Sequence, residues 1–110
     1  MTIQWEHFEA VDMRAGTVIE VKLFAKARKP AYQLWIDFGP MGIRKSSAQI
    51  TALYAPEELV GRQVIAVVNF PPRQIADFMS EVLVLGVYNE NNDVVLLQPD
   101  RAVQNGGKVG

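Results

Sequence analysis

Six short runs with strand-like alternation, separated by turn-forming residues, constrain the fold of this chain more than any other feature. The alternation is clearest in "YQLWIDFG", where Tyr32, Leu34, Ile36 and Phe38 share one face. The six expected strands cover residues 14–24, 32–39, 43–50, 62–70, 81–87 and 94–99. No helical pattern long enough to join parallel strands lies between them. Short strands with local connections are typical of a small β-barrel.

Helical periodicity is confined to two short segments. Residues 3–11 place three apolar side chains near one helical face, and Pro56 begins a helical turn within residues 51–61. The second segment lies between the third and fourth expected strands. We therefore expect an all-β fold with small helical segments, an OB-fold (oligonucleotide/oligosaccharide-binding) five-stranded barrel with an added strand. An SH3-like barrel is the alternative, and residues 105–110 are expected to form a loose tail.

The length and composition are those of one globular domain. At 110 residues the sequence fits a single domain, residues 1–110, and its apolar fraction of 49% argues against disorder. The absence of cysteine excludes disulfides and thiolate chemistry. The N-terminus lacks the basic start and apolar run of a signal peptide, and no apolar stretch approaches the ~20 residues of a membrane span. We expect a soluble, cytoplasmic protein with no membrane insertion.

Basic residues are concentrated in one part of a nearly neutral sequence. The formal net charge is −1, which argues against a globally basic nucleic-acid binder. Between residues 14 and 45 only Glu20 and Asp37 oppose the bases, which are Arg14, Lys22, Lys26, Arg28, Lys29, Arg44 and Lys45. Such asymmetry can create a local cationic patch, and a solvated loop is the plainer interpretation.

Residue patterns for catalysis or metal binding are missing from the sequence. His7 is the one histidine, and no cysteine or acidic cluster accompanies it at ligand spacing. The serines lack the G-x-S-x-G elbow of a hydrolase, and "GPMG" is too short for a phosphate-binding loop. The sequence therefore predicts no catalytic residue, no metal site and no cofactor, and we expect a protein that is not an enzyme.

The stretch "VVNFPPRQIADFMSEVLVLG", residues 67–86, is too long for a simple hairpin connection between two apolar strands. Pro71 and Pro72 stiffen the exit from the fourth strand, which fixes where the neighbouring side chains project. Three apolar residues follow, and we expect them to cap the open end of the barrel or to line a groove for an apolar peptide. These residues are Ile75, Phe78 and Met79.

Trp35 has two candidate roles. It points away from the face that Leu34 and Ile36 share, which makes it a candidate for stacking on a nucleic acid. Packing against the N-terminal segment or a partner subunit is the alternative, because large aromatic residues are enriched at interfaces.

Several motifs together resemble a known family. They include "DMRAGTVIEV", "KPAYQLWIDFG", "NFPPRQI" and "SEVLVLG", within a likeness that extends from Asp12 to Val109. On these residues the protein is identified as a member of the CsaA family of export-related chaperones. This family is part of a tRNA-binding domain superfamily that includes the C-terminal domain of bacterial methionyl-tRNA synthetases. The resemblance implies a homodimer sealed by extensions at both ends, residues 1–13 and about 99–110, with an interface role for Trp5, Phe8 and Val103.

The resemblance also implies two activities, the binding of unfolded or pre-export polypeptides and the binding of tRNA. Where synthetase-type relatives carry lysines this protein has Pro71 and Gln74, and Glu81 replaces a neutral residue. These differences weaken the attraction for phosphate, so polypeptide binding is the first hypothesis. Its expected residues are Asn69, Phe70, Arg73, Ser80 and Glu81. The alternative is structure-specific tRNA binding by Lys26, Arg28, Lys29, Arg44, Lys45 and Arg73.

Overall fold

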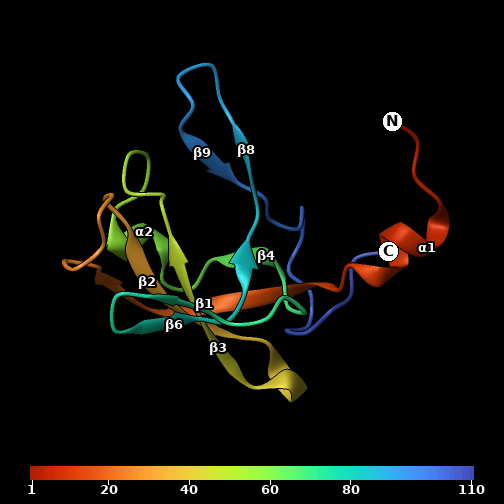
Figure 1. Ribbon diagram of the computed structural model, residues 1–110. Helices are drawn as coiled ribbons and strands as arrows, with labels where there is room; N and C mark the ends of the chain where they lie inside the picture. The colour runs from red at the N-terminus through yellow and green to blue at the C-terminus, as the bar shows by residue number, and fades with distance from the viewer.

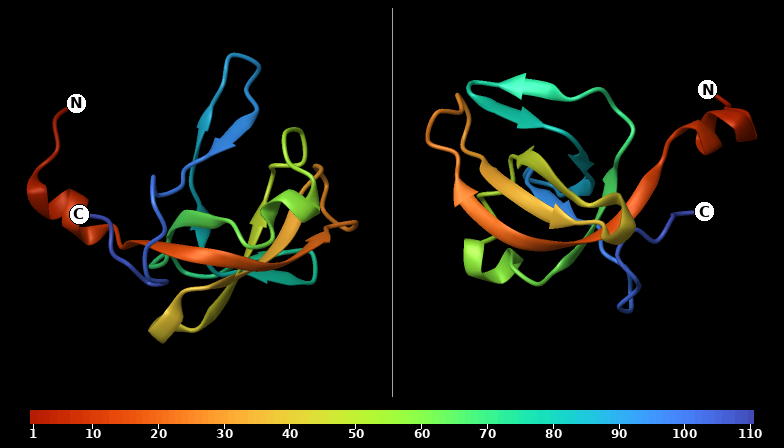
Figure 2. Two further views of the ribbon diagram at one scale, coloured as in Figure 1. Left: turned by 180° about the vertical axis from the view of Figure 1, so that it is seen from behind. Right: turned by 90° about the horizontal axis from the view of Figure 1, so that it is seen from below.

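Five strands form one antiparallel sheet that curls into a nearly closed barrel in the computed structural model, which describes residues 1–110 (Figures 1 and 2). Their order across the sheet is β3-β2-β1-β4-β7. The barrel closes where the segment before β7 meets β3, since Glu81 N donates to Lys45 O at 2.8 Å. This architecture confirms the expected OB-type barrel. The strand bounds are β1 Met13–Leu23, β2 Tyr32–Asp37, β3 Ile43–Ala48, β4 Gln63–Val67 and β7 Leu83–Val84.

The barrel interior is filled by the face of β2 that the alternating pattern predicts. Tyr32, Leu34, Ile36 and Phe38 are all buried, and the last three have no exposed surface. They pack in one apolar cluster with residues of β1 and β4, among them Val18. Burial of this many large apolar side chains is the main stabilising contribution to the barrel.

Gly16 of β1 allows the backbone to approach this core closely. A Cβ atom at position 16 would lie 2.7 Å from Ile36 Cγ2 and 2.8 Å from Phe38 Cδ1. Any larger residue would therefore displace two buried side chains.

Three short helical segments accompany the barrel: α1 Trp5–Ala10, the 3-10 turn η1 Gly39–Met41, and α2 Pro56–Leu59. Leu59 of α2 is fully buried in the main core. The helix α1 extends away from the barrel and lies beside the C-terminus (Figure 2), and none of its residues is buried. None of these helices has the length and apolar character needed to cross a bilayer.

Two hairpins follow β4. The first joins β5 Arg73–Ile75 to β6 Phe78–Ser80, and the second joins β8 Gly86–Tyr88 to β9 Val94–Leu96 and projects from the barrel (Figure 1). The expectation of one continuous strand over residues 81–87 is wrong. The backbone changes its pairing partner at Leu85, whose N–H donates to Ile65 O of β4 while its carbonyl accepts from Leu97 N.

Residues 105–110 do not form the loose tail that the sequence suggested. Gly106 N donates to Ala15 O at 2.7 Å, and Ala15 N donates in return to Gly107 O at 2.9 Å. A further bond joins Val109 N to Met13 O at 2.9 Å. The C-terminal segment thus continues the sheet along the start of β1. A glycine-rich segment held through its backbone carries no side-chain pattern that sequence reasoning could have used.

Candidate functional site

A pocket of about 370 Å³ opens between the β5–β6 hairpin, the end of β3 and the segment that leaves β4. Four of the five expected polypeptide-binding residues lie in its wall, and the structure adds Val82 and Leu83, which sequence reasoning did not assign to the site. The lining residues are Ser47, Phe70, Pro71, Arg73, Ile75, Ser80, Glu81, Val82 and Leu83.

The register of the β5–β6 hairpin decides which side chains face the pocket. Arg73 pairs with Ser80, and Ile75 pairs with Phe78. Because side chains alternate along a strand, these four share the face that is turned toward β3. Met79 and its partner Gln74 lie exposed on the opposite face. Ile75 thus lines the pocket, which agrees with the groove-lining alternative expected for it from the sequence.

Side chains fasten the hairpin to the edge of β3. Ser47 N donates to Ser80 Oγ at 3.0 Å, and Lys45 N donates to Glu81 Oε1 at 2.9 Å. Two backbone donors of an edge strand are thereby satisfied by side chains, which also shields that edge from pairing with other proteins. Ser80 and Glu81 therefore build the pocket as well as line it.

An aromatic cluster on the outer face of the sheet holds the tip of the hairpin. The ring of Phe78 lies 5.4 Å from that of Phe24 and 5.9 Å from that of Trp35, in edge-to-face arrangements. Trp35 thus packs against the β5–β6 hairpin of the same chain, which is neither of the two roles predicted from the sequence. Phe78 covers this outer face and does not cap the barrel. Lys22 Nζ and Lys45 Nζ lie over the Trp35 and Phe78 rings, at 5.2 and 5.1 Å from the centroids.

The cations expected to bind tRNA are distributed over several surfaces. Lys26 Nζ forms an ion pair with Asp77 Oδ2 at 2.7 Å, which ties the basic loop to the turn of the hairpin. This hydrogen bond and charge raise the pKa of Lys26 and lower the pKa of Asp77. Arg44 Nε donates to Met41 O at 3.3 Å, and Lys45 follows it in β3 and so points to the opposite face.

Five of the six expected cations make no ion pair within the protein, and three of these five are also exposed. Arg28 and Lys29 are exposed in the basic loop, and Arg73 is exposed at the pocket. The structure therefore does not gather the six candidate tRNA-binding residues into one cluster. It places Arg73 with the polypeptide-binding set and Arg28 and Lys29 on the loop between β1 and β2.

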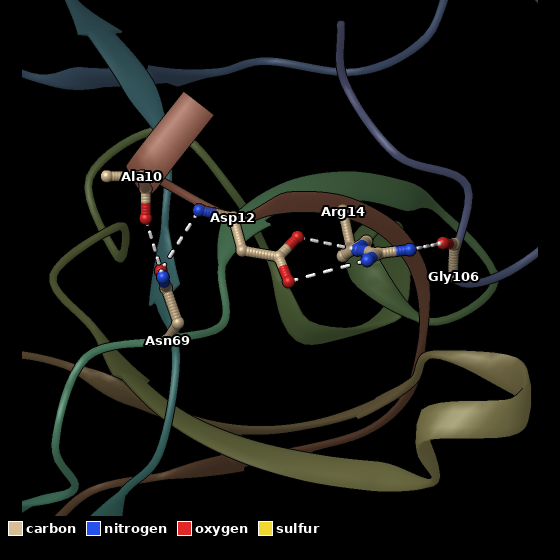
Figure 3. Close-up of polar contacts among 5 residues, drawn as sticks. All are labelled: Ala10, Asp12, Arg14, Asn69 and Gly106. Carbon is tan, nitrogen blue, oxygen red and sulfur yellow. Dashed lines mark hydrogen bonds and ion pairs between the residues drawn. The ribbon is translucent and has the colours of Figure 1, made fainter. Parts of the chain in front are cut away.

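Asn69 lies outside the pocket, although the sequence grouped it with the polypeptide-binding residues. Its side chain points toward Ala10 and Asp12 of the N-terminal extension (Figure 3). Its Nδ2 donates to Ala10 O at 2.7 Å and its Oδ1 accepts from Asp12 N at 3.0 Å. Asp12 in turn forms an ion pair with Arg14 at 2.6 Å, and Arg14 Nη1 donates to Gly106 O at 3.1 Å. This network joins the pocket loop to both terminal segments.

The terminal segments expose the residues expected at a dimer interface. Trp5 and Phe8 lie with ring centroids 6.4 Å apart and, with Ile3 and Gly110, they line a second hollow of about 470 Å³. Val103 belongs to a different segment, where Gln63 holds its backbone: Val103 N donates to Gln63 Oε1 at 3.0 Å.

The fold and the sequence agree with a known family. Residues 13–108 match the family model described as putative tRNA binding domain. The chain belongs to this tRNA-binding domain family. Its fold is similar to that of the chaperone CsaA from Bacillus anthracis str. Ames, with 52% identity, a TM-score of 0.95 and full coverage of both proteins. The CsaA chaperone protein from Picrophilus torridus is 48% identical with a TM-score of 0.94, an alignment that spans 99% of this protein and 100% of that one. The resemblance to the CsaA family is thereby confirmed.

Curated relatives of this tRNA-binding domain are longer proteins. The methionine–tRNA ligase of Bdellovibrio bacteriovorus is 39% identical over 107 residues, which are 97% of this protein and 15% of the ligase. The methionine–tRNA ligase of Methanothrix thermoacetophila is 39% identical over 104 residues, which are 94% of this protein and again 15% of the ligase. In these ligases the domain is a small part of a larger protein.

Proposed function

We propose that this tRNA-binding-domain protein is a non-catalytic, chaperone-type binder of unfolded or precursor polypeptides that works as a homodimer in the cytoplasm. The pocket beside the β5–β6 hairpin carries this proposal. Its wall is largely apolar and has a few polar groups, as in sites that bury an apolar side chain and orient it by hydrogen bonds. The likeness to solved CsaA chaperones over the whole sequence supports the same role.

Phe70 supplies the apolar surface that a polypeptide would cover. Its side chain stands at the pocket with 55% of its surface exposed, and Pro71 follows it in the wall. A large aromatic residue left open beside a hollow is a favourable contact for an incoming apolar side chain. The prolines fix its position before binding, which lowers the entropy cost of forming the complex.

The test measures fluorescence anisotropy of a labelled, signal-bearing precursor segment titrated with wild type and with Phe70→Ala. Phe70→Ala is expected to weaken binding roughly tenfold, because the variant lacks the aromatic ring that the bound polypeptide would cover. Met79→Ala is the matched control, because Met79 is an exposed apolar residue on the opposite face of the adjoining hairpin. Equal binding by wild type and Phe70→Ala would remove this pocket from the mechanism.

Structure-specific tRNA binding is the second candidate, favoured by the family match over residues 13–108. Arg28 and Lys29, unpaired on the basic loop, would contact phosphate together with Lys26. A gel-shift titration over a series of salt concentrations tests this, because each phosphate contact steepens the salt dependence. Changing these three residues together to Ala is expected to reduce the slope. Absence of binding at low salt would exclude the activity.

Dimerisation through the terminal extensions completes the proposal. Residues 1–13 carry an apolar surface that the barrel of the same subunit does not cover, with Trp5 79% and Ile3 56% exposed. The end of the chain lies beside them (Figure 2), since Val109 N donates to Met13 O at 2.9 Å and Gly110 lines the hollow with Trp5. A second copy would bury this surface, and exposed apolar surface of this kind marks interaction sites.

A further inference from the structure

We propose that the pocket beside the β5–β6 hairpin selects polypeptide segments that carry a carboxylate next to an apolar side chain, with Arg73 as the residue that sets this preference. This inference rests on the proposed polypeptide-binding function and specifies the ligand of the same site. The carboxylate has two sources, an acidic side chain and the free C-terminus of a polypeptide, and both present the same two oxygens.

Arg73 is the cation of the pocket, and its charge is not neutralised within the protein. It is exposed and forms none of the four ion pairs of the structure. The single acid of the lining, Glu81, forms no ion pair with Arg73, and its Oε1 accepts from Lys45 N at 2.9 Å. The guanidinium therefore remains free for a ligand, and its planar fork of donors matches a carboxylate in a bidentate geometry.

The two serines of the pocket add donors. Ser80 Oγ accepts from Ser47 N at 3.0 Å, which leaves the Ser80 hydroxyl hydrogen available. The Ser47 hydroxyl makes no hydrogen bond within the protein, although its residue lines the same wall. The register pairs Arg73 with Ser80, so both side chains leave the hairpin on the same face. Donors thus outnumber free acceptors here, and a ligand rich in acceptors complements them.

The apolar part of the wall adjoins this polar edge. Phe70 and Leu83 are 55% and 49% exposed, and Ile75 lies on the same hairpin face as Arg73. An apolar group of the ligand can therefore be buried while the neighbouring carboxylate stays at the rim near the guanidinium. A lysine at the same place in the ligand would meet Arg73 as a like charge, which opposes binding.

The test uses short labelled peptides of one sequence, acetylated and amidated at their ends, that differ at the residue after a central Leu. Wild type is expected to bind the Leu-Asp peptide roughly three- to fivefold more tightly than Leu-Asn, as an exposed charge pair allows, and to bind Leu-Lys weakest. A second pair of peptides ends in Leu with a free or an amidated C-terminus. A preference for the free carboxylate in that pair identifies the polypeptide terminus as the better source.

Charge reversal at Arg73 gives the decisive comparison. Arg73→Glu is expected to invert the order so that Leu-Lys binds better than Leu-Asp, and Arg73→Lys to keep part of the original preference. Lys22→Glu is the matched control, because it makes the same charge change on an exposed residue outside the pocket and should leave the order unchanged. Circular dichroism verifies that each variant is folded.

Three results would overturn the inference. Equal binding of Leu-Asp and Leu-Asn by wild type would show an apolar site without selection for anions, and polypeptide binding itself would stand. Binding of no peptide at all would refute the proposed function together with the inference. If Arg73→Glu abolishes tRNA binding and leaves the peptide order unchanged, Arg73 serves phosphate recognition instead.

Discussion

The side-chain oxygen of Asn69 accepts a hydrogen bond from the backbone N–H of Asp12 at 3.0 Å, which joins the loop beside the pocket to the N-terminal extension (Figure 3). The amide group of the same side chain donates to Ala10 O at 2.7 Å. One asparagine therefore satisfies an acceptor and a donor at the point where α1 meets β1. Only an amide side chain offers both functions in this geometry.

Asn69→Ala is expected to free the N-terminal extension and to lower the free energy of unfolding by about 1–2 kcal/mol, because two hydrogen bonds are lost at a partly solvated site. Asn69→Asp should be as harmful, since a carboxylate cannot donate to the carbonyl of Ala10. Hydrogen exchange of the Asp12 amide, followed by NMR, measures the local effect. Asn91→Ala is the control, because Asn91 is exposed in the β8–β9 turn. Unchanged protection of the Asp12 amide in Asn69→Ala would contradict the role.

Glu81 is expected to matter as a hydrogen-bond acceptor more than as a charge. Glu81→Gln keeps an oxygen for Lys45 N–H, so stability should change by less than about 0.5 kcal/mol, whereas Glu81→Ala leaves that N–H without its partner and should cost about 1–2 kcal/mol. Urea denaturation of both variants measures the difference. Equal losses of stability in Glu81→Gln and Glu81→Ala would show that the negative charge of Glu81, and not its role as an acceptor, stabilises the fold.

The structure explains why the sequence predicted the barrel better than the site. The alternation of β2 reports its buried face directly, since Leu34 and Ile36 line the core. The β5–β6 hairpin is harder to predict, because its strands have three residues each and the turn uses Ala76 at φ 53° where glycine or asparagine is usual. A hydrogen bond between a side chain and a backbone group far away in the sequence, such as that between Asn69 and Asp12, leaves no local pattern in the sequence.

Phe70 and Arg73 both line the pocket, and the prolines between them are the sequence signal of a rigid rim loop that projects its neighbours. Asn69 was grouped with them only because it precedes Phe70, and its amide turns to the N-terminal extension instead. The ion pair between Lys26 and Asp77 could not be predicted from the sequence either, because these residues are 51 positions apart.

The ion pair between Lys26 and Asp77 should make a small, pH-dependent contribution to stability. Lys26 holds the pKa of Asp77 below its ordinary value of 3.8, so the contribution is present above about pH 3.8 and is lost as the pH falls through the lowered pKa. Asp77 holds the pKa of Lys26 above 10.5, so the contribution is also lost as the pH rises through that raised value.

The melting temperature of wild type minus that of Asp77→Asn should therefore be positive near neutral pH and vanish in strong acid. A difference that is independent of pH would rule out the pair as its cause. The effect is small because both groups are solvated.

Trp5→Glu is expected to convert a dimer into a monomer. The helix α1 has six residues, too few to be stable alone in water, and it buries none of them against its own barrel. Its order therefore requires a covering surface, and the apolar hollow between Trp5 and Phe8 is where a second copy would contribute one. Sedimentation equilibrium should give the mass of two subunits for wild type and of one subunit for Trp5→Glu. Leu23→Glu is the matched control, because Leu23 is also an exposed apolar residue, 67% exposed, but lies at the end of β1 opposite to the extension. A monomeric wild type, or a dimer that survives Trp5→Glu and fails in Leu23→Glu, would refute the assignment of this interface.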